Sequence, residues 1–286
     1  MWLDALYHSL NPVALQLGPL AIRWYGLAYF FGFVCAAVVI YRVARRWGVG
    51  LSVDQLTTVV IGIAFGVIIG ARLFYVIFYG DGYYLANPLK ILAFSEGGMS
   101  FHGGLAGAVV GGSIACRSIG YSIPTMCDLA VIGAPLGLFF GRCANFVNGE
   151  LWGKPCDLPW GVMFDDAGGG AVYRHPSQLY EALLEGLVIF VVLLLLSRRR
   201  PPRPQGTFLG TFLALYGVFR FAVEFVRLPD KQVGYLFGTD WLTMGQVLSV
   251  PLVIIGVMVV VLALRRNRPQ CGLLSPAEDA EVADEQ

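Results

Sequence analysis

Long apolar runs, separated by short polar segments, dominate the pattern of this chain. A helix needs about 20 mostly apolar residues to cross the hydrocarbon core of a bilayer. Seven segments meet this need: 20–41, 56–79, 99–116, 125–141, 177–196, 207–226 and 242–264. The third and fourth of them are the shortest. The pattern therefore predicts an all-α polytopic membrane protein with about seven transmembrane helices within residues 1–266.

The composition agrees with a membrane location. Hydrophobic residues make up 57% of the chain and charged residues only 14%, whereas about a quarter of the residues are charged in soluble domains. The mean hydropathy is +0.67. Such a chain is expected to have membrane lipid around it and no nucleic-acid partner.

The basic residues predict the orientation of the spans. Arginines gather in alternate connections: Arg42, Arg45, Arg46, Arg117, Arg198, Arg199, Arg200, Arg203, Arg265, Arg266 and Arg268. Because cytoplasmic loops carry the excess of Lys and Arg, the N-terminus is expected outside and the C-terminus in the cytoplasm. The opposite connections at about 80–98 and 142–176 are long, which predicts a small periplasmic head domain.

The sequence also allows a prediction for the first span and one for the C-terminal segment. The first apolar run lacks a basic leader and a small-residue cleavage site, so the first span is expected to stay in the mature protein. Residues 267–286 contain two prolines and five acids with little to bury. This composition predicts a disordered cytoplasmic tail.

The six cysteines favour neither a metal site nor a disulfide framework, because they are scattered and form no CxxC pair. Cys143 follows Arg142, and a neighbouring cation can activate a thiol. A lone cysteine in a span is more often a small buried hydrophobe, and we prefer that interpretation. No metal and no other cofactor is expected.

Four polar residues of the sixth predicted span share one face. Tyr216, Arg220, Glu224 and Arg227 follow one another at spacings of four, four and three, which places them within an arc of about 80° on a helix. Charges inside a span are costly and need a partner or water. The stripe is therefore either an ion pair that joins two helices or part of a polar interior.

Further polar groups inside the spans favour the second interpretation. His102, flanked by Gly103 and Gly104, is the obvious candidate for a general base. The full set expected near the outer half of the membrane is Tyr25, Arg72, His102, Arg142, Asn145, Asn148, Glu150, Gln178, Glu181, Arg220 and Glu224. Several arginines together imply an anionic ligand, most simply a phosphate.

The segment GRCANFVNGELWG at 141–153 carries a family resemblance. It matches the pattern GRxxNFxNGExxG at every fixed position, and the chain thereby resembles the bacterial prolipoprotein diacylglyceryl transferase family. The resemblance extends to RWYGLAY at 23–29, GGMSFHGG at 97–104, RHPSQLYE at 174–181, YGVFRFAVEFVRLPD at 216–230 and MGQVLSVP at 244–251. The departures are Arg23, Ala71 and Glu96, where the family more often has histidine, glycine and aspartate.

The resemblance implies a reaction between two substrates in the bacterial cytoplasmic (inner) membrane. The diacylglyceryl group of phosphatidylglycerol moves to the thiol of the lipobox cysteine in the signal peptide of a prolipoprotein. A thioether forms and glycerol 1-phosphate leaves, in the first step of lipoprotein maturation. The nucleophile belongs to the substrate, so no cysteine of this chain is required.

The resemblance also implies roles for the polar residues. His102 would be the base for the thiol, while Arg142 and Arg220 would hold the phosphate as it gains charge. An alternative is that His102 binds the phosphate as a cation and that water or a carboxylate takes the proton. The residues expected to bind substrate are Tyr25, Arg72, Asn145, Asn148, Glu150, Gly153, Tyr216 and Glu224.

Two other classes of function compete with a transferase. One is a secondary transporter of an organic anion, and the other is a scaffold that merely pairs buried charges. A transporter would often show an internal repeat with broken helices, and the two halves of this sequence show no such duplication. Neither alternative accounts for the segment at 141–153, so the transferase is the preferred prediction.

Overall fold

A computed structural model of the chain describes residues 1–18, 20–80, 82–93, 97–229 and 234–273. The chain folds into two compact units. The first unit combines Met1–Trp47 with Cys127–Gln270, and the second combines Gly48–Met126 with Cys271–Gln286.

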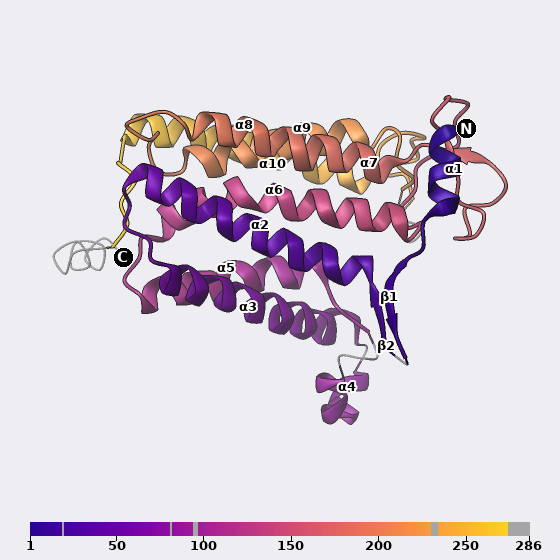
Figure 1. Ribbon diagram of the computed structural model, residues 1–286, viewed down its shortest axis with the longest axis horizontal. Helices are drawn as coiled ribbons and strands as arrows, with labels where there is room; N and C mark the ends of the chain where they lie inside the picture. Colours follow the sequence, from indigo (N-terminus) through magenta and orange to yellow (C-terminus); the bar gives the residue numbers. More distant parts are fainter. Residues whose placement is uncertain (19, 81, 94–96, 230–233, 274–286) are drawn as a thin grey trace. The chain divides into compact units, whose positions relative to one another are not determined.

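Long helices form most of the first unit. They are α2 (Trp24–Trp47), α6 (Ile123–Val147), the continuous segment α7 (Ser177–Glu181), η3 (Ala182–Val188) and α8 (Ile189–Leu196), then α9 (Thr207–Val223) and α10 (Met244–Arg266). These helices run side by side (Figure 1). Glycines allow close approach, because a Cβ atom on Gly32 of α2 would lie 2.9 Å from the Cα atom of Gly137 in α6. The backbones of α9 and α10 approach similarly at Gly210 and Gly256.

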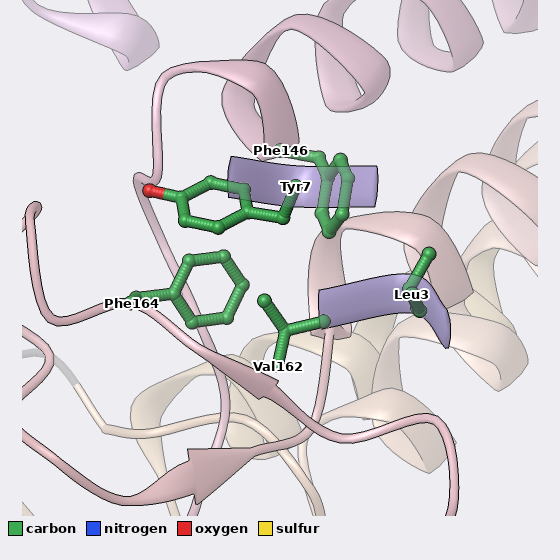
Figure 2. Close-up of a cluster of buried hydrophobic side chains, with 5 residues drawn as sticks. All are labelled: Leu3, Tyr7, Phe146, Val162 and Phe164. Atoms are coloured by element: carbon green, nitrogen blue, oxygen red, sulfur yellow. The ribbon is translucent and has the colours of Figure 1, made fainter. Parts of the chain in front are cut away.

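A short N-terminal helix and a folded loop cover one end of α6. The helix α1 (Trp2–Ser9) runs crosswise to α6 in Figure 1 and packs against the antiparallel strands β3 (Val162–Met163) and β4 (Tyr173–Arg174). Figure 2 shows the small core between them, formed by Leu3, Tyr7, Phe146, Val162 and Phe164. The residues that follow α6 therefore have a hydrophobic core of their own.

A β-hairpin precedes the first long helix. Strands β1 (Val13–Leu17) and β2 (Leu20–Arg23) pair antiparallel, and Gly18 supplies a left-handed turn residue with φ +59°. The first span, predicted from residue 20 to 41, is therefore a helix over Trp24–Trp47. The apolar residues at 20–22 pair as part of strand β2, and the helix extends into the arginines that follow the apolar stretch.

Two helices that meet through glycines form the core of the second unit. Helix α3 (Val53–Tyr79) packs against α5 (Phe101–Ser118), with short helices α4 (Tyr83–Ala86) and η1 (Pro88–Leu92) between them in sequence. The facing glycines are Gly62, Gly66 and Gly70 on α3 and Gly103, Gly107 and Gly111 on α5. Small residues spaced four apart let membrane helices approach until their backbones touch.

Five helices of the described chain are long and apolar enough to cross a membrane: Trp24–Trp47, Val53–Tyr79, Ile123–Val147, Ser177–Leu196 and Met244–Arg266. The other two predicted spans are also helical, but α9 has 17 residues and α5 is a glycine-rich helix of 18. The prediction of a helical multi-pass membrane protein is thus confirmed. Within the predicted tail, Gln270 donates to the Asp128 carboxylate at 2.7 Å, and residues 274–286 lie outside the described part.

Candidate active site

Two arginines from different helices of the first unit meet at one buried carboxylate. The Nε atom of Arg142, near the end of α6, lies 2.7 Å from Oε2 of Glu181 at the end of α7. The Nη1 atom of Arg220, in α9, lies 3.2 Å from the same oxygen. The Glu181 side chain is completely buried, and the side chains of Arg142 and Arg220 are 20% and 13% exposed.

The local backbone explains why these side chains meet. After Glu181 the helix continues as a seven-residue π-helical stretch, η3, a conformation that is frequent at functional sites. A Cβ atom on Gly186 in this stretch would lie 2.7 Å from the Cβ atom of Phe139. Glycine thus lets η3 approach α6 one turn before Arg142.

Further charges extend the cluster. Arg220 approaches Glu185 at 3.9 Å and Glu224 at 3.0 Å. Arg227 lies 3.9 Å from Glu181 and 4.0 Å from Glu224. We call the set Arg142, Glu181, Glu185, Arg220, Glu224 and Arg227 the arginine–glutamate network. Its three cations and three carboxylates come from three helices and the turn after α9.

A chain of amides leads from the network to Glu150. Arg142 donates to the Asn145 side-chain oxygen at 3.5 Å, and the Asn145 amide donates to Oε2 of Glu150 at 3.1 Å. The Asn148 amide donates to the other Glu150 oxygen at 3.4 Å. The Gln178 amide donates to the Glu150 backbone carbonyl at 2.5 Å. The polar residues of the segment 141–153 are therefore linked to one another.

Two tyrosines of the predicted site also belong to this unit. Tyr25, in the first turn of α2, interacts electrostatically with Arg142 and Glu150, and its hydroxyl lies 3.1 Å from that of Tyr29. Tyr216 lies one helical turn before Arg220 and interacts with it electrostatically. The structure thus brings both tyrosines to the surroundings of the network.

Gly153 is placed by packing. A Cβ atom there would lie 2.5 Å from the carbonyl oxygen of Val226 and 2.8 Å from the Cβ atom of His175. The residue forms an isolated β-bridge with Arg227, and its N–H donates to the His175 carbonyl at 2.9 Å. Its lack of a side chain allows this close backbone contact beside the network.

Arg72 and His102 belong to the second unit. The Arg72 side chain is buried, and it donates to the backbone carbonyls of five residues: Lys90, Ile91, Ala93, Gly97 and Gly98. Its guanidinium also lies over the ring of Tyr84 at 5.3 Å. Arg72 thus ties the connection between α3 and α5 together, and substrate binding by it stays a prediction.

His102 is the second residue of α5 and is exposed. The helix begins with Ser100, whose hydroxyl accepts the Gly103 N–H at 3.5 Å and whose own N–H donates to the Ala71 carbonyl at 3.0 Å. The imidazole makes an edge contact with the Phe101 ring, with centroids 5.8 Å apart. These contacts hold the start of α5 against the end of α3.

One cluster of the described residues has donor types suited to a metal ion. Ligand atoms of His8, Asp165 and Asp166 lie within 4.8 Å of one another, and all three residues are exposed. His8 is 2.9 Å from the Asp165 carboxylate, which raises the pKa of His8 and lowers that of Asp165. Since exposed acidic groups are common without an ion, we assign no metal to this cluster.

Two carboxylates of the network, Glu181 and Glu185, were not among the residues predicted to bind substrate or to react. The sequence analysis placed Gln178 and Glu181 in the polar set expected near the outer half of the membrane, and it placed Arg227 on the stripe of the sixth span. It did not indicate that Glu181 joins the other helices. The available signal was a pair of carboxylates one turn apart within an apolar span.

Comparison with known proteins identifies the family of this chain. Residues 12–262 match the family model described as prolipoprotein diacylglyceryl transferase. Proteins named phosphatidylglycerol–prolipoprotein diacylglyceryl transferase are similar to this chain over nearly their full lengths. That of Geobacter sulfurreducens is 48% identical over 91% of this chain and 98% of the relative. That of Pseudomonas aeruginosa is 46% identical over 92% of this chain and 97% of the relative.

The matched region includes α2, the network and the segment 141–153, so the similarity covers the site as well as the spans. On this evidence the chain belongs to the prolipoprotein diacylglyceryl transferase family.

Proposed function

We propose that this protein transfers the diacylglyceryl group of phosphatidylglycerol to the thiol of the lipobox cysteine of a prolipoprotein. The observation that carries the proposal is the meeting of Arg142 and Arg220 at buried Glu181, in a chain of the transferase family. Guanidinium groups bind phosphate oxygens through paired N–H donors. Buried among helices, they act where the dielectric constant is low and electrostatic contacts are strong.

The reaction is a displacement at a saturated carbon. The thiolate sulfur of the lipobox cysteine attacks the carbon of the diacylglyceryl group that carries the phosphate ester. The S–C bond forms, and the bond between this carbon and the phosphate oxygen breaks. The electron pair leaves with the phosphate oxygen, and glycerol 1-phosphate is released. Arg142 and Arg220 stabilise the charge that grows on this oxygen.

The thiol must lose its proton before or during the attack, because the thiolate is the reactive form. His102 takes this proton as the general base. Its replacement by glutamine separates the two roles considered for it. Loss of transfer with phosphatidylglycerol binding retained supports the base, whereas loss of both overturns it.

The remaining polar residues position the lipid. Asn145, Asn148 and Glu150 orient the glycerol head group and Arg142, which their linked hydrogen bonds support. Glu224 holds Arg220, since the two lie 3.0 Å apart one helical turn from each other. The wider binding set comprises Tyr25, Arg72, Gly153 and Tyr216.

The protein lies in the bacterial cytoplasmic membrane, with its N-terminus outside and its C-terminus in the cytoplasm. The clustering of arginines in alternate connections supports this orientation. The segments at about 80–98 and 142–176 then face the periplasm, and the small core around α1 is the centre of the head domain. Residues 267–286 form the cytoplasmic tail.

Transfer of a radiolabelled diacylglyceryl group by the purified protein tests the proposal. The substrates are labelled phosphatidylglycerol in detergent and a lipobox peptide, and the controls are Arg142→Ala and a peptide with serine in place of cysteine. Label on the cysteine peptide with the wild-type protein only supports the transferase. No transfer by folded wild-type protein refutes it and reopens the case for an anion transporter.

A further inference from the structure

We infer that Glu181 is the positioning residue of the reaction: it holds the guanidinium groups of Arg142 and Arg220 in the relative placement that the substrate phosphate requires. This inference rests on the proposed function, because it assigns a role within the transfer reaction. Glu181 touches neither substrate in the proposal and acts only through the arginines.

The geometry singles out Glu181 from the other carboxylates. Its Oε2 atom is within 3.2 Å of nitrogen atoms from both α6 and α9, and its Oε1 atom lies 3.9 Å from Nε of Arg227. Each of the other carboxylates of the network has ion pairs to Arg220, to Arg227 or to both. Within the described structure, Glu181 is thus the carboxylate that ties Arg142 to the rest of the network.

The burial of Glu181 makes its placement rigid. The side chain has no exposed area, and its helix continues directly into the π-helical stretch that touches α6 at Gly186. A buried carboxylate must be compensated by opposite charge. The three arginines provide this compensation, and the ion pairs keep their guanidinium groups close to the carboxylate.

Fixed donors are useful because the leaving phosphate needs them in place before the C–O bond breaks. Preorganised groups stabilise a developing charge without reorganising during the reaction. Misplacement of a catalytic group by about 1 Å can cost about 100-fold in rate. The loss of Glu181 should therefore slow the chemical step more than it weakens lipid binding.

Glu181→Gln is the first test, since glutamine keeps the size of the side chain and removes its charge. We expect kcat to fall about 100-fold. The KM for phosphatidylglycerol should fall, because the arginines keep their positive charges and lose one of the carboxylates that neutralise them. A variant that was merely unfolded in part would lose active enzyme without any decrease in KM.

Glu185→Gln is the matched control. Glu185 lies four residues further along the same chain, is equally buried, and contacts one arginine at 3.9 Å. Its replacement should slow transfer by less than about tenfold, since it leaves the pairing of Arg142 with Arg220 through Glu181 intact. An equal loss of kcat in both variants would overturn the inference.

Glu181→Asp covers the case in which the glutamine variant does not fold. Aspartate keeps the charge that compensates the arginines but draws the carboxylate back by one methylene. We expect a folded protein with kcat reduced about tenfold or more and with KM close to that of the wild type. Wild-type kcat in this variant, or a raised KM with normal kcat, would contradict a positioning role.

The wild-type assay separates this inference from the proposed function. If the wild-type protein transfers the labelled group, the function stands whatever the Glu181 variants do. If it does not, the function itself fails before any variant is compared.

Discussion

Replacement of Gly107 by alanine should separate the two helices that carry Arg72 and His102. A Cβ atom on Gly107 would lie 2.7 Å from the carbonyl carbon of Gly66 and 3.0 Å from the Cα atom of Gly70, and nearer still to the Gly66 carbonyl oxygen. All of these are backbone atoms, so no side chain can rotate away. Helices α3 and α5 must therefore move apart locally.

The size of the shift follows from these distances. Ordinary contact of a Cβ atom begins at 3.4 Å, so the 2.7 Å approach to the Gly66 carbonyl carbon alone requires a movement of at least about 0.7 Å, and the nearer carbonyl oxygen requires more. Overpacking of this kind costs about 1–3 kcal/mol, and we expect a loss of about 2 kcal/mol. The movement also loosens the contacts at the neighbouring glycines, since membrane helices associate largely through close van der Waals packing.

Unfolding in detergent, followed by heating or by titration with denaturant, measures the effect against Gly104→Ala. Gly104 is on the same helix, but its Cβ atom would lie 3.5 Å from its nearest neighbour, the Cβ atom of Ala71. That variant should stay within about 1 kcal/mol of the wild type, because alanine favours helix more than glycine does. Equal stability of the two variants would refute the argument that the glycines set the distance between the helices.

Three further predictions concern other parts of the chain. Asp128→Ala should lower the free energy of unfolding by about 2 kcal/mol, measured by thermal unfolding, because the carboxylate accepts two backbone N–H bonds of 2.8 Å at the start of α9. Gly245→Ala should slow transfer about tenfold in the radiolabel assay, since a Cβ atom would lie 2.6 Å from the carboxyl carbon of Glu224 and displace it. His8→Gln should lower the melting temperature below about pH 6.5 but not at about pH 9, because pairing with Asp165 raises the pKa of His8 and this contribution is lost as the pH rises through the raised pKa.

The helices could be predicted from the sequence because each run is long and mostly apolar. The hairpin before α2 could not, since the apolar residues at 20–22 are also compatible with a helix that starts earlier. Strand pairing with residues 13–17 decides between them. In contrast, the spacing of four residues between Arg220 and Glu224 predicted that they share one helical face, and in the structure the two side chains pair at 3.0 Å.

The role of Glu181 illustrates what periodicity leaves open. Sequence spacing fixes the face of a helix on which a side chain lies, but not the helix that this face meets. The partner is decided by the close contact of Gly186 with Phe139, which brings α6 and therefore Arg142 against η3. Such a contact depends on the path of the chain over more than 40 residues, so spacing within either helix could not predict it.

The arginines differ in a way that bears on which of them can serve the reaction. The N–H groups of Arg72 donate to backbone carbonyls. These acceptors carry no net charge, and they can move only if the main chain moves. Arg142 and Arg220 instead contact side-chain carboxylates and an amide, and their side chains are 20% and 13% exposed. In the proposed function a phosphate shares the guanidinium groups of Arg142 and Arg220 without unfolding a loop, whereas the contacts of Arg72 hold the start of α5. Arginine thus contacts backbone carbonyls in the second unit and ionised side chains in the first, so the partner atoms, rather than the residue type, distinguish the two kinds of site.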